Sequence, residues 1–117
     1  MTPRGSAGVV LSTTDSVAGF EIDAVLGVVS AEWVGGVNVF RDMFAGIRNI
    51  VGGRSAALEK EMKAGREAVL EELRQRAAEL GADAVVTIRL DSSPMSGGSG
   101  AMLMLGGIGT AVRLRRG

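Results

Sequence analysis

The stretch FRDMFAGIRNIVGGRSAALEKEMKAGREAVLEELRQRAAELG, residues 40–81, decides the fold. From Phe40 to Val51, apolar residues recur at the spacing of one helix face. A second stripe with the same spacing opens at Arg54 or Ser55, and its members are Leu58, Met62, Gly65, Val69, Leu73, Ala77 and Leu80. We predict a short and a long helix that meet at Gly52-Gly53, because paired glycines readily adopt the left-handed conformation that stops a helix.

The segments on either side of these helices favour β-strands. Asp15–Gly19 has turn chemistry, so we expect the first two strands to form a hairpin. Asp91–Gly100 is rich in Ser and Gly and is predicted to be a flexible loop. Gly106–Gly109 is predicted to be a bulge or a tight turn. The expected strands are residues 8–14, 21–30, 84–90, 101–105 and 110–114.

The order ββ-αα-ββ lacks alternating βαβ units, which argues for an α+β fold with an antiparallel sheet. Gly27 inside the second strand suggests a bulge or a close neighbour. Beyond Leu26 this strand is apolar on both faces, as expected where a strand is covered on both sides. In the strand at residues 84–90, we expect Val86, Ile88 and Leu90 to face the core. The chain is interpreted as a flexible tail, residues 1–7, followed by a single domain, residues 8–117.

Composition narrows the possible functions. The 117 residues include no cysteine and no histidine, so the usual general base at physiological pH, Ser-His and Cys-His couples, and the commonest metal ligands are absent. We therefore expect no enzyme and no cofactor. The formal net charge is zero, which provides no drive toward nucleic acid or an anionic membrane and is compatible with self-association.

Neither a signal-peptide core nor a membrane-spanning segment is expected. The apolar run near the start is short, and the one from Ala101 to Val112 falls well below the ~20 residues that a spanning helix needs. We expect a soluble, cytoplasmic protein. Arg113, Arg115 and Arg116 form a small basic end without interleaved aromatics, so neither nucleic acid nor a membrane is expected as a partner.

The corner at Gly52, Gly53, Arg54 and Ser55 is the candidate ligand site. Two glycines let a ligand approach the backbone, and the start of a helix offers free N–H groups. The Arg54 guanidinium can donate two parallel hydrogen bonds, and the Ser55 hydroxyl can cap the helix. It is not a Walker loop, because residue 48 is Arg where a glycine is needed. The alternative is a purely structural helix corner, in which Ser55 caps and Arg54 forms an ion pair.

Metal ligands would have to come from carboxylates or methionine sulfur. Met102 and Met104 share one face of a strand, and thioethers can hold Cu(I), although core packing explains them as well. No metal site is assigned.

Several strings, in order, are similar to the YbjQ-like family, which is labelled heavy-metal-binding and has no established activity. The resemblance covers roughly residues 9–114. It rests on Thr13-Thr14, Leu26–Ser30, Phe40-Arg41-Asp42, Ile50–Ser55, Gly81–Val86 and Gly109–Val112.

The resemblance implies a small α+β fold with a dodecin-like layer of helix on antiparallel sheet, assembled as a homopentamer. The heavy-metal label fits this chain poorly, because Cys and His are absent. Phe20 and Leu58 stand where the family leads us to expect tyrosines.

Two hypotheses therefore stand. The first is a non-enzymatic, ring-forming homo-oligomer that holds a small anion or metabolite of unknown identity at Gly52–Ser55. The second is a heavy-metal-binding or metal-resistance protein.

Overall fold

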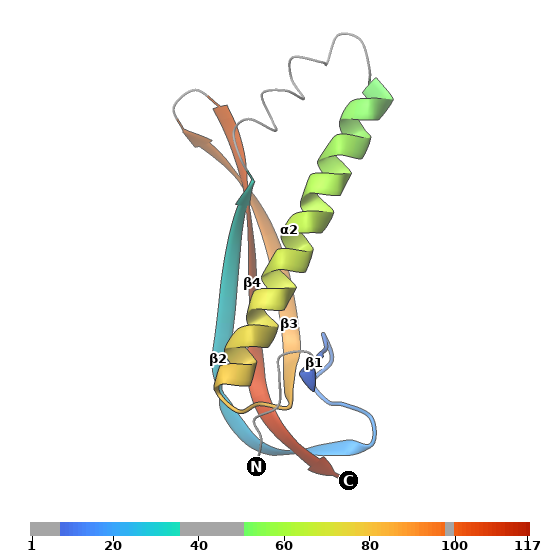
Figure 1. Ribbon diagram of the computed structural model, residues 1–117, viewed down its shortest axis with the longest axis vertical. Helices are drawn as coiled ribbons and strands as arrows, with labels where there is room; N and C mark the ends of the chain where they lie inside the picture. The colour runs from blue at the N-terminus through green and yellow to red at the C-terminus, as the bar shows by residue number, and fades with distance from the viewer. Residues whose placement is uncertain (1–7, 36–50, 98–99) are drawn as a thin grey trace.

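The computed structural model describes residues 8–35, 51–97 and 100–117, and for residues 51–58, 94–97 and 100–102 it describes the backbone alone. The predicted first helix from Phe40 therefore lies outside the described residues. The described elements are β1 (Val10–Leu11), β2 (Phe20–Gly35), α2 (Val51–Glu79), β3 (Ala84–Gly97) and β4 (Gly100–Arg116). One helix lies across one face of a four-stranded sheet, which makes a two-layer α+β fold (Figure 1).

The sheet is mixed, with the strand order β1-β3-β4-β2. β4 pairs antiparallel with both β2 and β3, but β1 runs parallel to β3. The predicted opening hairpin is therefore wrong, as is a wholly antiparallel sheet. The physical reason is length: β1 has two residues, whereas β4 pairs with β2 from Phe20 to Gly35.

β3 and β4 form one long hairpin, so the predicted loop at Asp91–Gly100 is also wrong. Their pairing continues to Gly97 opposite Gly100. Gly106–Gly109 is not a turn either, because it lies within β4. A Cβ added at Gly107 would lie 2.5 Å from Val69 Cγ1 of the helix. This glycine allows the helix to approach the strand closely rather than turning the chain.

Three register shifts set which side chains face the helix, and the first lies between Ile22 and Ala24. The predicted bulge at Gly27 is confirmed by a second shift in the β2–β4 register and a φ of 146°. A third shift follows Val86, where Thr87 adopts a φ of 52°, a region that β-branched residues rarely occupy. As a result Val86 turns away from the helix, contrary to expectation, and packs in a cluster with Ala84 and Val112.

The long apolar stripe of α2 is confirmed. Val69, Leu73 and Ala77 are buried and pack with side chains from all four strands. The cluster around Val86 lies on the other face of the sheet and does not take part. Gly65 is buried at the same interface, and a Cβ there would lie 2.5 Å from both Leu105 Cδ1 and Trp33 Cε3. Leu80, at the end of the stripe, is 46% exposed. The helix thus lies so close to the sheet that only glycine fits at position 65.

Gly65→Ala tests this close packing. Alanine normally stabilises a helix interior by about 1 kcal/mol relative to glycine. Here the added methyl group overpacks against Trp33 and Leu105, so we expect the free energy of unfolding to fall by about 1–3 kcal/mol. Urea denaturation followed by circular dichroism measures the change. Ala64→Gly, at an exposed position of the same helix, is the control and reports the propensity term alone.

Candidate functional site

The predicted corner at Gly52, Gly53, Arg54 and Ser55 lies at the beginning of α2. The structure begins this helix at Val51, so the glycine pair belongs to the helix and does not precede it, contrary to expectation. A helix accommodates glycine when its backbone bonds compensate for the lost conformational freedom. The side chains of these four residues lie outside the described part of the structure, which leaves the anion site a prediction.

The structure draws attention instead to the sheet face that α2 leaves uncovered. Directly opposed residues of an antiparallel pair share a face. Val28 lies opposite Thr110, and Val25 lies opposite Val112, which belongs to the outer cluster with Val86. Val25 and Val28 are 68% and 69% exposed, so the expectation that this strand is covered on both sides fails within one chain.

The edge of β2 is open along its length in the part of the chain that the structure describes. β4 is its sheet neighbour on one side, and no described strand pairs with it on the other. Phe20, Ile22 and Val34 of the same strand are also substantially exposed. An edge strand with exposed apolar side chains is a template for pairing with another chain.

The opposite edge of the sheet carries an apolar groove of about 400 Å³. It opens where β1 ends and β3 continues, and its wall is formed by Leu11, Leu70, Ile88 and Leu90, with Ser12 and Thr13 at its rim. Leu90 is 37% exposed. This edge therefore offers apolar surface as well.

The strained Thr87 holds the groove's rim in place. Its N–H donates to the Thr14 carbonyl at 2.8 Å, and the Ile88 N–H donates to the Ser12 carbonyl at 3.1 Å. Ser12 and Thr14 are further joined by a hydrogen bond between their hydroxyl groups. The backbone strain at Thr87 is thus offset by hydrogen bonds that hold the segment from Ser12 to Thr14 against β3.

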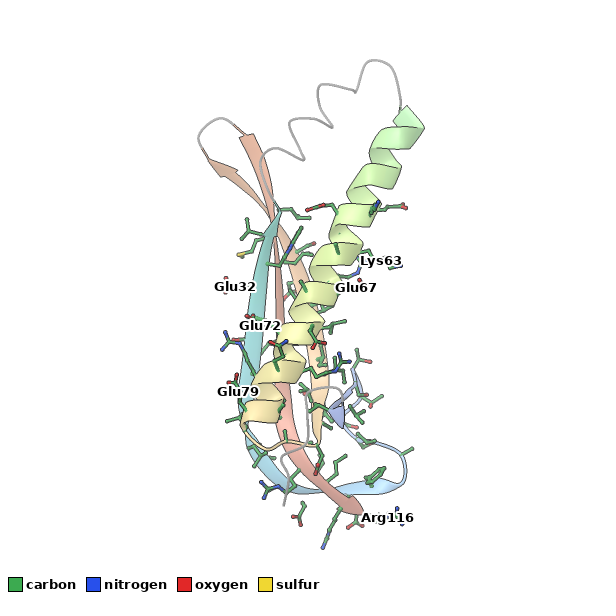
Figure 2. The ribbon with its side chains drawn as sticks, in the orientation of Figure 1. Glu32, Lys63, Glu67, Glu72, Glu79 and Arg116 are labelled. Carbon is green, nitrogen blue, oxygen red and sulfur yellow. The ribbon has the colours of Figure 1, made fainter. Side chains whose placement is uncertain are left out.

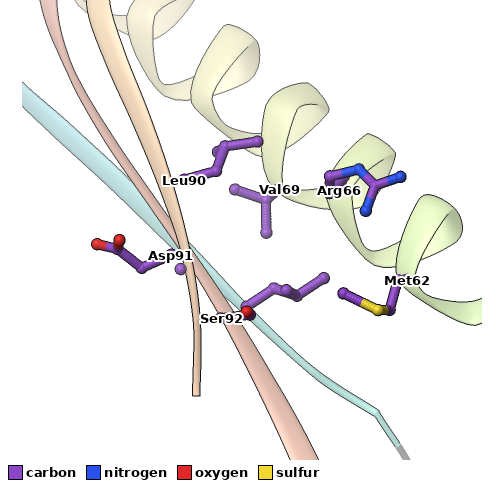
Figure 3. Close-up of a pocket in the computed structure, with 8 residues that line it drawn as sticks. Met62, Arg66, Val69, Leu90, Asp91 and Ser92 are labelled. Atoms are coloured by element: carbon purple, nitrogen blue, oxygen red, sulfur yellow. The ribbon is translucent and has the colours of Figure 1, made fainter.

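A smaller cavity of about 100 Å³ lies further along the same edge, between α2 and β3. Figure 3 shows Met62, Val69 and Leu90 gathered between the helix and the strands, with Arg66 on the helix at the rim. Asp91 points away from the helix on the far side of the sheet. The cavity is thus apolar inside with a cation at its mouth.

Charged side chains divide between the two edges. Figure 2 shows Glu32, Glu72 and Glu79 on the β2 side of the helix and Lys63 on the other side. Glu72 and Arg76 line a hollow with Glu32, which places this flank of α2 over β2. Glu72 and Arg76 form an ion pair, with 3.7 Å between Arg76 Nη2 and Glu72 Oε1.

The other flank of α2 lies over the β1–β3 edge. Leu70 lines the apolar groove there, and Arg74 Nε donates to the Val9 carbonyl at 3.5 Å. Lys63 and Arg66 precede Leu70 by helical spacings, so they share this flank. Glu67 lies here too, and Glu71 pairs with Arg74 at 2.6 Å. Glu59, four residues before Lys63, lies here as well, so the cations and the carboxylates on this flank balance, whereas the β2 flank is acidic.

The described residues offer no donor set for a borderline or soft divalent metal. The sequence has no Cys or His, and no group of three or more carboxylates comes together in residues 8–35, 59–93 and 103–117. Zinc and nickel sites draw on thiolate and imidazole ligands. The residues that the structure describes therefore do not fit a site for either metal.

The helical segments were also tested for membrane-spanning character. Among the residues that the structure describes, no helix combines the length and the apolar character needed to cross a membrane.

These observations define a two-layer α+β domain, with one helix on a mixed four-stranded sheet and its surface features concentrated at two opposite sheet edges. The chain belongs to the YbjQ-like family, described as "Putative heavy-metal-binding", whose model matches residues 9–115. The resemblance seen in the sequence is thereby confirmed.

A solved structure supports the same fold. The chain is similar to the crystal structure of a protein of unknown function, which belongs to the DUF74 family, from Pediococcus pentosaceus. The two share 14% sequence identity with a TM-score of 0.60, over 92% of this chain and 99% of the other. At this identity the similarity speaks for the fold alone.

Sequence reasoning missed both edges as functional surfaces. One signal was present: the run Leu26–Ser30 is apolar on both faces, and we interpreted it as a strand covered on both sides.

Proposed function

We propose that this protein is a non-enzymatic, homo-oligomeric module, a dodecin-like two-layer subunit that assembles as a ring, a homopentamer by its resemblance to the family. The observation that carries the proposal is the exposed apolar surface of β2. Val25 and Val28 are two-thirds exposed beside an open strand edge. Fully burying a valine side chain contributes about 1.5–3 kcal/mol, so a second subunit gains substantially by covering this surface.

The non-enzymatic part of the proposal rests on the sequence. Without His or Cys, acid-base or nucleophilic chemistry would fall to Asp, Glu, Lys, Ser or Thr. We further propose that the module holds a small anion or metabolite at Gly52–Ser55. The N–H groups of a helix's first turn have no partner within the helix, and they favour negative charge.

The wild-type protein should be an oligomer at micromolar concentration. Five chains of 12.0 kDa give a particle of about 60 kDa, which native mass spectrometry and light scattering both resolve. A stable monomer at these concentrations contradicts the proposal.

Arg54→Ala separates the anion site from the assembly. We expect the affinity for inorganic phosphate, measured by calorimetry, to fall by about tenfold, the loss expected for one charge-assisted hydrogen bond. The native mass should not change. Unchanged phosphate binding together with collapsed assembly makes Arg54 a structural residue instead. Lys60→Ala, at an exposed position of the same helix and outside the corner, is the matched control.

Heavy-metal binding is the second candidate, and one observation favours a narrow form of it. The β3–β4 register pairs Met95 with Met102, and Met104 follows two positions along β4. Methionine thioethers suit Cu(I) and not Zn²⁺ or Ni²⁺.

A titration compares the two candidates directly. If the chain binds metal through these methionines, Cu(I) binds with micromolar or better affinity under reducing, anaerobic conditions, and Met102→Leu with Met104→Leu abolishes the binding. Zn²⁺ and Ni²⁺ should bind no tighter than millimolar in either case. Binding of Cu(I) no tighter than millimolar rejects the metal function.

A further inference from the structure

We propose that the seam between α2 and β3 binds an amphipathic monocarboxylate, with its apolar chain in the groove and its carboxylate on Arg66. The seam consists of the apolar groove at Leu11, Leu70, Ile88 and Leu90 and the smaller cavity beside it. This site is separate from the corner at Gly52–Ser55, and the inference does not depend on the oligomeric state.

The seam has the size and the lining of a site for a small lipid-like molecule. The groove of about 400 Å³ and the cavity of about 100 Å³ share Leu90 as a wall. Ligand pockets in proteins typically have volumes of about 300–1,000 Å³ and are lined mostly by apolar side chains with a few polar groups. In the groove, Ser12 and Thr13 supply those polar groups at the rim. An apolar chain therefore fits along the seam.

The helix presents one cation to this seam within an otherwise apolar row. Met62, Val69 and Leu70 line the two hollows, and Arg66 lies among them at helical spacing. Across the cavity, β3 contributes Leu90 and Ser92, while the carboxylate of Asp91 points away from the helix (Figure 3). The described side chains across the seam thus give Arg66 no opposite charge.

Arg66 also differs from two other arginines of the same helix. Arg74 pairs with Glu71 at 2.6 Å, and Arg76 pairs with Glu72 at 3.7 Å. Among the side chains that the structure describes, no carboxylate lies within ion-pair distance of Arg66. A guanidinium matches a carboxylate with two parallel hydrogen bonds. This flank of α2 is balanced in charge as a whole, so the preference for an anion comes from the placement of Arg66 and not from a net field.

The spacing of Arg66 and the groove sets the minimum length of the ligand. Leu70 lies four residues after Arg66, about 6 Å along the helix axis. A chain whose carboxylate rests on Arg66 must extend at least this far to enter the groove. Acetate is too short, and inorganic phosphate has no apolar part. A medium-chain fatty acid such as decanoate has both the charge and the chain.

Calorimetry with decanoate, kept below the concentration at which it forms micelles, tests the inference on the wild-type protein. We expect saturable binding tighter than millimolar, whereas acetate should give none. In amide NMR spectra, decanoate should shift the signals of Leu70, Ile88 and Leu90.

Arg66→Ala separates the charge from the chain. We expect the affinity for decanoate to fall by about tenfold, because a charge-assisted pair is lost. The affinity for decanol, which has the same chain without the charge, should not change. Lys63→Ala is the matched control, since it removes an exposed cation of the same flank that does not line the cavity, and it should bind decanoate like the wild type.

Leu90→Ser tests the apolar part of the site. It should weaken the binding of both decanoate and decanol, because the groove and the cavity lose the wall that they share. Val10→Ser, at an exposed position of the same sheet edge outside the groove, is its control. Circular dichroism melting verifies that each variant is folded.

The inference is overturned if decanoate binds no tighter than acetate, if the shifted amides lie outside the seam, or if folded Arg66→Ala binds decanoate like the wild type. In the last case Arg66 covers the cavity with its hydrocarbon stem alone. These outcomes differ from failure of the proposed function, which native mass and phosphate affinity measure.

Discussion

One α-helix can cover only one face of a sheet, and the sheet of this protein carries apolar side chains on both faces. α2 buries Val29, Ala31 and Leu105 on its side. On the other side, the segment before β2 contributes Val17 to a small cluster with Val86 and Val112. Beyond that cluster nothing in the described chain covers Val25 and Val28. The proposed assembly follows from this exposed surface.

Close contact between the helix and the sheet fixes where the charges lie. Gly65 and Gly107 leave no room for a side chain at the interface, so the helix can neither roll nor shift without a clash. With the stripe of Val69, Leu73 and Ala77 held against the sheet, the neighbouring helical positions fall over the two edges. Glu72 and Glu79 lie toward β2, whereas Lys63 and Glu67 lie toward the opposite edge.

Periodicity predicted the elements whose structure is decided locally. The stripe of α2 and the bulge at Gly27 both depend on residues close together in sequence, and both are confirmed. The α+β class and the family followed from the order of elements and from short strings.

Long-range pairing was beyond the reach of the same reasoning. Asp91–Gly100 has the composition of a loop, yet each residue from Asp91 to Gly97 finds a partner on β4, and backbone pairing outweighs local preference. The glycines at 106–109 look like a turn until the helix above them is placed. Val86 changes face because Thr87 takes a conformation that its side chain does not predict. Which edges stay open is a property of strand order, so the candidate surfaces emerged only from the fold.

The central claim is that a second copy covers the β2 edge, and amide hydrogen exchange along this strand tests it most directly. In an isolated edge strand, alternate N–H groups point to solvent and exchange freely. If β2 is covered, the amides from Val28 to Gly35 should all be protected at micromolar protein concentration, and alternate ones should lose protection on dilution below the dissociation constant. Alternate amides that exchange freely at every concentration, beside protected amides in β4, would contradict the account.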